Sequence, residues 1–99
     1  MNYPVIRYLR EPRTGEGKGA PYGVLMATSP GCYGWSLCCK RDTFSRERGK
    51  FIAMERAKSG SGIEALRDRA WTVYYGDAPR LHTVLSALCY FADRIEAAE

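Results

Sequence analysis

The side chains that most often carry out catalysis are few in this chain, and their spacing matches no catalytic pattern. His82 is the only histidine, and no second imidazole or Cys-His-Asp order accompanies it, so we expect no catalytic role for it. Acidic side chains such as Glu47 and Glu64 stand beside cations at helical spacing. This arrangement is typical of solvated helix faces rather than of two carboxylates converging in a cleft. The sequence therefore predicts that the protein is not an enzyme.

Metal and phosphate chemistry are not indicated either. The four cysteines lack the two-residue spacers of common zinc sites, and we expect reduced structural thiols, buried or half-buried: Cys32, Cys38, Cys39 and Cys89. Gly15, Gly17 and Gly19 suggest a phosphate-binding loop, but that motif ends in Gly-Lys-Ser/Thr before a helix. Here Lys18 is followed by Gly-Ala-Pro. We therefore expect no metal and no cofactor.

The excess positive charge is concentrated in residues 40–58. This segment contains seven cations and three anions, whereas eight cations and eight anions cancel in the rest of the chain. An acidic partner should therefore meet this segment first. In a helix, Arg46 and Lys50 lie four residues apart on one side, and nearby Tyr33 or Phe44 could stack on a base. The candidate partner-binding residues are Lys40, Arg41, Arg46, Arg48, Lys50 and Tyr33.

Three strands are expected to precede this segment. Residues 3–10 alternate as a strand does when one face is covered and the second is partly covered. The apolar runs 22–28 and 33–40 bracket Ser29-Pro30-Gly31, a tight-turn sequence, so we expect them to pair as an antiparallel hairpin. Residues 13–19 contain three glycines and no apolar side chain, which predicts a mobile loop.

The basic segment itself is predicted to be a helix over residues 44–58. Asp42 or Thr43 can cap its first turn, and Ser59-Gly60 marks its end. Small residues recur every four positions in this helix, and they would let its axis approach a sheet or another helix closely: Gly49, Ala53 and Ala57.

Two further helices are expected. Ser61-Gly62-Ile63-Glu64 fits a capping box, which favours a second helix over residues 63–71. Residues 71–75 are rich in β-preferring side chains, so helix and strand both remain open there. Asp77 and Pro79 begin the last helix, whose apolar stripe runs from Leu81 to Ile95.

These elements predict an α+β fold, a three-stranded antiparallel meander with two to three α-helices packed on one face. The 99 residues are 45% hydrophobic, and this length favours a single domain over residues 1–99. Because the chain has no run of about 18 apolar residues and no leader-like N-terminus, we expect a cytoplasmic protein without membrane partners.

Three short runs in the middle of the chain form a pattern: Gly34–Cys38, Asp42–Arg46 and Gly49–Ala53, followed by Arg56-Ala57. The pattern resembles the hairpin-to-helix region of small proteins encoded by bacteriophages and prophages, most of them of unassigned function. The resemblance implies a mobile-element protein that binds and inhibits a host protein or a nucleoprotein defence complex, as anti-CRISPR proteins do. The charge alone favours an alternative, a nucleic-acid-binding accessory protein that uses helix 44–58. Neither interpretation specifies the partner or the oligomeric state.

Overall fold

The computed structural model describes residues 2–11, 19–38, 43–60 and 78–98. Within these ranges the chain forms three strands and two helices: β1 (Val5–Arg10), β2 (Pro21–Ser29), β3 (Cys32–Leu37), α1 (Arg46–Ser59) and α3 (Ala78–Ala98). The strands make one antiparallel sheet in the order β1-β2-β3, so the predicted α+β fold and its meander are confirmed. Most of the loop expected at 13–19 lies outside the described residues, and so do the helix expected at 63–71 and the helix or strand expected at 71–75.

The β2–β3 hairpin turns at Pro30-Gly31, as the sequence predicts. Gly31 has a φ of +85°, a backbone conformation that side-chain-bearing residues rarely adopt. Strand β3 ends at Leu37 rather than at residue 40, although the Cys38 amide still donates a hydrogen bond of 2.7 Å to the Tyr22 carbonyl.

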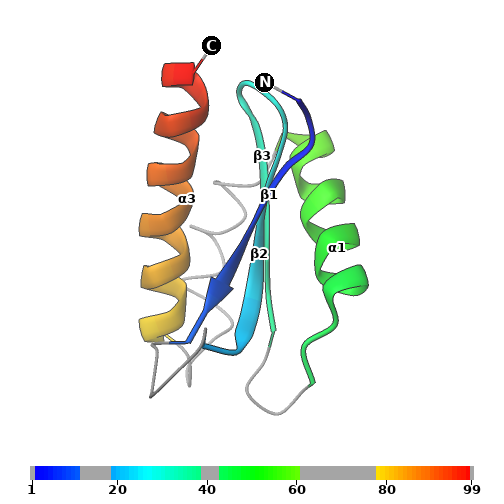
Figure 1. The fold of residues 1–99 in the computed structure, drawn as a ribbon, viewed down its shortest axis with the longest axis vertical. Helices are drawn as coiled ribbons and strands as arrows, with labels where there is room; N and C mark the ends of the chain where they lie inside the picture. Colours follow the sequence, from blue (N-terminus) through cyan, green and yellow to red (C-terminus); the bar gives the residue numbers. More distant parts are fainter. Residues whose placement is uncertain (1, 12–18, 39–42, 61–77, 99) are drawn as a thin grey trace.

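Each helix packs on one face of the sheet, and the two helices take opposite faces (Figure 1). Val24 of β2 packs with Ala53 of α1 in one apolar cluster. Its neighbour Leu25, which points to the other side of the strand, packs with Leu88 of α3 in the second cluster. The expectation that the helices share a face is therefore corrected. The physical reason lies in β2, which buries six consecutive residues, 22–27, and so requires cover on both of its faces.

Helix α1 begins two residues later than expected, at Arg46. Its N-cap is Ser45, whose side chain accepts a hydrogen bond of 3.3 Å from the Arg48 amide, rather than Asp42 or Thr43. The helix ends as predicted at Gly60, which has a φ of +72°.

The small-residue stripe of α1 lies against β3. Gly49, Ala53 and Ala57 are all buried, which confirms the predicted close approach. The approach is closest at Gly34 of β3, where an added Cβ would overlap the Ala53 carbonyl oxygen and lie 2.6 Å from the Ala57 nitrogen. The backbones of α1 and β3 are therefore in close contact, and this contact sets the distance between the helix and the sheet.

Helix α3 carries the predicted apolar stripe. Its buried residues recur at helical spacing and face the sheet: Val84, Leu88, Phe91, Ala92 and Ile95. The stripe packs on β2 and β3, the two strands with which α3 makes its main contacts.

On each outer strand of the sheet, an arginine side chain donates a hydrogen bond to a backbone carbonyl. At β3, Nη1 of Arg56 donates to the Trp35 carbonyl at 2.9 Å, and the guanidinium carbon lies 4.1 Å from the centroid of the Trp35 ring. At β1, Nη1 of Arg7 donates to the Ile6 carbonyl at 3.1 Å. A side chain at these edges hinders pairing with a further strand.

Candidate functional site

The first turn of α1 lies beside β1, and the residue before its cap makes the contact. Because Ser45 ends the extended approach to the helix, Phe44 is placed against the side of β1 that α1 covers. The Phe44 and Tyr8 rings meet edge to face, with centroids 6.3 Å apart and an interplanar angle of 90°. Both rings are half-buried, so each keeps part of its surface open to solvent.

Two arginines lie over the Tyr8 ring. The guanidinium carbon of Arg46 is 5.2 Å from the ring centroid, and that of Arg10 is 6.0 Å from it. Both distances are within the range of a cation–π contact. Nη1 of Arg10 also donates to the Gly19 carbonyl at 3.1 Å, which fixes its direction. We call these four residues the Tyr8 cluster: Tyr8, Arg10, Phe44 and Arg46.

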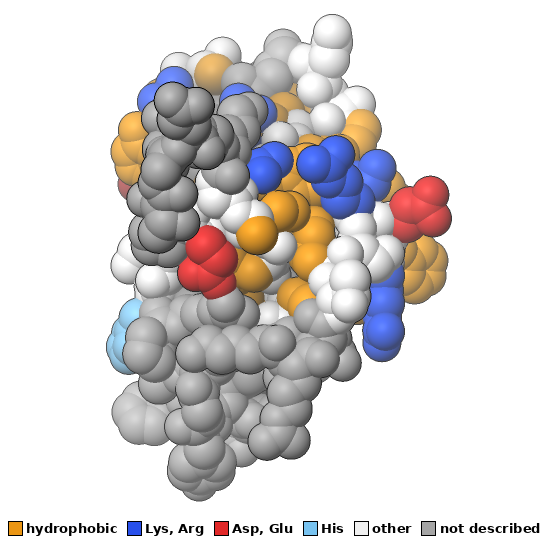
Figure 2. Space-filling view, turned by 60° about the horizontal axis from the view of Figure 1, so that its bottom comes forward, with side chains coloured by type: hydrophobic (Ala, Val, Ile, Leu, Met, Phe, Trp, Pro, Cys, Tyr) orange, Lys and Arg blue, Asp and Glu red, His pale blue; other side chains and the backbone are white. Residues whose placement is uncertain are grey.

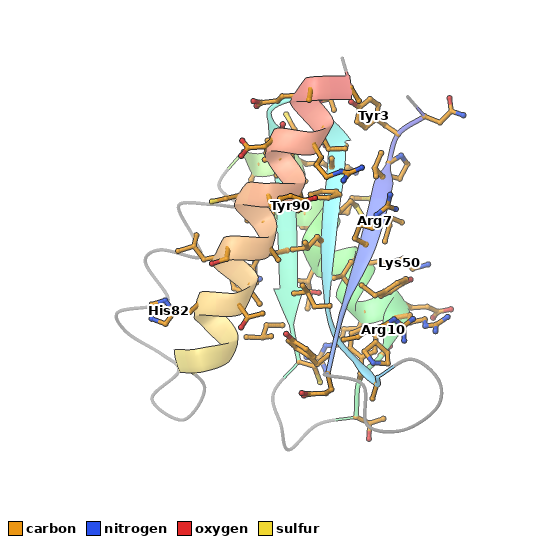
Figure 3. All side chains as sticks on the ribbon, turned by 60° about the vertical axis from the view of Figure 1, so that its left-hand side comes forward. Tyr3, Arg7, Arg10, Lys50, His82 and Tyr90 are labelled. Atoms are coloured by element: carbon orange, nitrogen blue, oxygen red, sulfur yellow. The ribbon has the colours of Figure 1, made fainter. Side chains whose placement is uncertain are left out.

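Among the described residues, the positive charge in and next to the Tyr8 cluster has no ion-pair partner. In the described part of the chain, no carboxylate forms an ion pair with Arg46 or Lys50. Lys50 lies one helical turn beyond Arg46 and extends the charge along α1 (Figure 3). Figure 2 shows Lys and Arg side chains gathered next to hydrophobic ones on the face toward the lower end of Figure 1. An anionic group approaching this face would meet unpaired cations.

The structure brings together some of the predicted binding residues and separates others. Arg46 and Lys50 lie on the side of α1 nearer to β1, whereas Arg48, two residues after Arg46, is rotated by about 200° around the helix. Lys40 and Arg41 lie outside the described residues.

Tyr33 does not join the basic residues. It is 7% exposed on the α3 face of the sheet, where its hydroxyl donates to Glu96 Oε1 at 3.1 Å. Burial is the main cause that raises the pKa of Tyr33 above its ordinary value of 10.0, and the hydrogen bond to Glu96 adds to the effect. Tyr33 is therefore a packed residue that links β3 to α3.

Tyr8 and Arg10 are not among the binding residues predicted from the sequence. The available signal is the alternation of β1, which places Ile6, Tyr8 and Arg10 on one face. It becomes informative only once α1 is known to cover that face, because Phe44 and Arg46 come from a distant part of the chain.

Helix α1 also presents one large apolar side chain to solvent. Phe51 is 65% exposed, and the residues one turn before and after it on the same face are Glu47 and Glu55. An exposed aromatic ring surrounded by charged side chains is typical of an anchor for a protein partner.

Other chemistry finds little support in the described ranges. They contain no group of three His, Cys, Asp or Glu side chains able to hold a metal ion. Cys32 and Cys38 are half-buried, which agrees with the expectation, whereas Cys89 is exposed and contradicts it; all three thiols are free. Neither described helix is both long enough and apolar enough to cross a membrane.

Comparisons with protein-family models, with curated proteins and with solved structures found no match to this chain.

Proposed function

We propose that the protein is a non-enzymatic inhibitor, encoded by a phage or another mobile element, that binds an acidic surface of a host protein or nucleoprotein defence complex in the host cytoplasm. The Tyr8 cluster carries this proposal, because it places two guanidinium groups over one half-buried ring. The resemblance of residues 34–57 to small phage proteins supports the mobile-element origin. The proposed activity is binding alone, without a catalytic step.

The geometry of the Tyr8 cluster suits recognition of carboxylate or phosphate groups. A guanidinium group that stacks on an aromatic ring keeps its N–H donors in the plane, where they can bind an oxyanion in a bidentate manner. Stacking also restricts the side chain before binding, which lowers the entropy cost of forming the complex. Arg46 is exposed and has no ion-pair partner among the described residues, so no ion pair with any of them has to be broken first.

Phe51 favours a protein as the partner. Protein interfaces combine a buried aromatic anchor with charged groups at the rim, and aromatic and Arg side chains contribute most to the affinity. Helix α1 carries both kinds of side chain on different sides: Phe51 is exposed to solvent, and Lys50 and Arg46 lie about 100° and 140° around the helix from it.

A nucleic-acid-binding accessory protein is the second candidate. The observation that favours it is the pairing of the Tyr8 and Phe44 rings with two arginines, because single-stranded nucleic acids bind to aromatic rings next to cations.

Affinity capture separates the two candidates. The tagged protein is incubated with bacterial cell extract, with and without nuclease, beside the Phe51→Ser variant. For a protein partner, we expect recovery to survive nuclease and to fall by about tenfold for Phe51→Ser, which removes the anchor. Recovery that disappears with nuclease and is unchanged for Phe51→Ser would contradict the protein-binding proposal and favour nucleic acid.

A further inference from the structure

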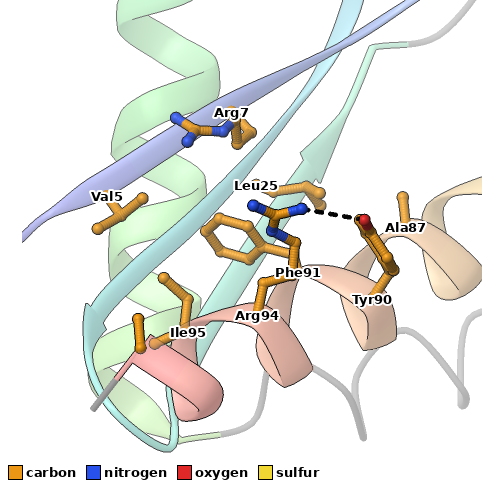
Figure 4. Close-up of a pocket in the computed structure, with 9 residues that line it drawn as sticks. Val5, Arg7, Leu25, Ala87, Tyr90, Phe91, Arg94 and Ile95 are labelled. Atoms are coloured by element: carbon orange, nitrogen blue, oxygen red, sulfur yellow. Dashed lines mark hydrogen bonds between the residues drawn. The ribbon is translucent and has the colours of Figure 1, made fainter.

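A pocket of about 430 Å³ lies between β1 and α3, on the face of the sheet opposite to the Tyr8 cluster (Figure 4). It exists because α3 packs on β2 and β3, which leaves Val5 and Arg7 of β1 beside the helix rather than beneath it. Its volume falls within the range of pockets that hold small molecules, about 300 to 1,000 Å³.

The floor of the pocket is apolar. Leu25 of β2 and Phe91 and Ile95 of α3 form it, and all three are buried. Along α3 the pocket is bounded by small side chains, Ala87 and Ala98, which leave the space between helix and strand unfilled. An elongated apolar group would fit along this floor.

Two arginines border the pocket from its two walls, Arg7 from β1 and Arg94 from α3 (Figure 4). Nη1 of Arg94 donates to the Tyr90 hydroxyl at 3.1 Å, and its guanidinium carbon lies 5.7 Å from the Tyr90 ring centroid. Arg7 is held by its hydrogen bond to the Ile6 carbonyl. None of the nine residues that line the pocket is acidic, so these cations are not balanced within it.

We infer that this pocket binds a small amphipathic carboxylate, a molecule with one carboxylate and an unbranched apolar tail. The tail would replace water on Leu25, Phe91 and Ile95, and the carboxylate would accept hydrogen bonds from Arg7 or Arg94. A cation of the same shape would be repelled by both arginines, and a neutral alcohol would gain the apolar contact without the ionic one. This inference does not depend on the proposed function, because it concerns the other face of the sheet.

The test is a titration of the full-length protein with decanoate, decanol and decylammonium below their micellar or solubility limits, followed by backbone amide NMR. We expect decanoate to shift the amides of β1 and α3 and to bind about tenfold more tightly than decanol, with decylammonium weakest. Equal affinities for decanoate and decanol would overturn the inference.

Variants locate the site. Arg7→Met and Arg94→Met keep an apolar stem and remove the charge. Each should weaken the binding of decanoate by about fivefold or more and leave the affinity for decanol unchanged. Arg48→Met is the matched control, because it makes the same change of charge on the exposed side of α1 and should have no effect. Ala87→Leu fills the pocket and should weaken the binding of both decanoate and decanol. An Arg48→Met effect as large as that of Arg94→Met would overturn the inference, and so would decanoate binding that is insensitive to Ala87→Leu.

Discussion

Ser36 places a hydroxyl group in the layer between β3 and α1. Its side chain is 4% exposed, and its Oγ has no hydrogen-bond partner among the described residues. Gly49 of α1 lies directly over it, since a Cβ built on Gly49 would be 3.1 Å from this oxygen. A buried hydroxyl without a partner loses the hydrogen bonds that it makes to water in the unfolded chain, so it destabilises the fold.

Ser36→Ala should raise the free energy of unfolding by up to about 1 kcal/mol, measured by urea denaturation. Ser36→Val is the control, because its two methyl groups would crowd the space beneath Gly49 and should give no gain. A lower stability for Ser36→Ala would mean that the hydroxyl makes a favourable contact after all.

Tyr33 should make stability depend on pH at the alkaline end. Burial raises the pKa of its phenol above 10.0, so above about pH 10 the folded protein retains a proton that the unfolded chain has lost. The free energy of unfolding should then fall as the pH rises through the ordinary pKa toward the raised one, and Tyr33 should add no pH dependence well below pH 10.

Tyr33→Phe removes the titrating group and tests this expectation. The variant should lose less stability than the unmodified protein between about pH 9 and 11, as measured by urea denaturation at each pH. At neutral pH it should cost about 0.5 to 1.5 kcal/mol for the lost hydrogen bond to Glu96. Parallel pH profiles for the two proteins would contradict the assignment.

At the scale of elements, the contact between α1 and the sheet was predictable in part. The four-residue spacing of Gly49, Ala53 and Ala57 predicts a close approach, and all three are buried. The sequence does not indicate that Gly34 is the opposing residue, because that depends on the height and angle at which α1 crosses β3. Nor was the opposite placement of the helices predicted, although the unbroken apolar run of β2 carries that signal.

Gly34→Ala is predicted to be among the most destabilising small substitutions in the chain. Its Cβ would overlap backbone atoms of Ala53 and Ala57, which cannot move aside as a flexible side chain can. We expect a loss of about 3 kcal/mol or more by urea denaturation. Gly31→Ala is the matched control, because it meets no atom within 4 Å and should lose only about 1 to 2 kcal/mol from its positive φ.

Gly49→Leu tests the same layer from the helix side. Leucine improves helix propensity by nearly 1 kcal/mol, yet a Cβ at this position would lie 2.9 Å from Val24 Cγ2. Overpacking should outweigh propensity and give a net loss of about 1 to 3 kcal/mol. A higher melting temperature would show that α1 can lift from the sheet at little cost.

At the scale of the whole molecule, the sheet separates two surfaces of different character. The α1 face carries the Tyr8 cluster and Lys50, and the α3 face carries the pocket bordered by Arg7 and Arg94. The positions of the charged residues in the sequence were enough to locate the excess positive charge in residues 40–58. It was not enough to find the Tyr8 cluster, because two of its four members come from β1 and join α1 only in the folded chain.

Charge reversal at Arg46 and Lys50 tests the proposal that the Tyr8 cluster side of α1 binds an acidic partner. The variant Arg46→Glu/Lys50→Glu changes the charge by four units beside Tyr8. It should leave the fold nearly as stable, because Arg46 opens the helix, where an acidic side chain is favourable. The control Arg7→Glu/Arg94→Glu makes the same change of charge with two exposed residues on the α3 face of the sheet, away from both the Tyr8 cluster and Phe51.

The measurement is the dissociation constant of each variant for the partner recovered by affinity capture, over a series of salt concentrations. We expect Arg46→Glu/Lys50→Glu to weaken binding by about tenfold or more and to lower its salt dependence, because two oxyanion contacts are lost. The control should weaken binding by less than about threefold, through long-range charge alone. Equal losses for the two variants, or full binding by Arg46→Glu/Lys50→Glu, would contradict the assignment of the partner surface to the Tyr8 cluster.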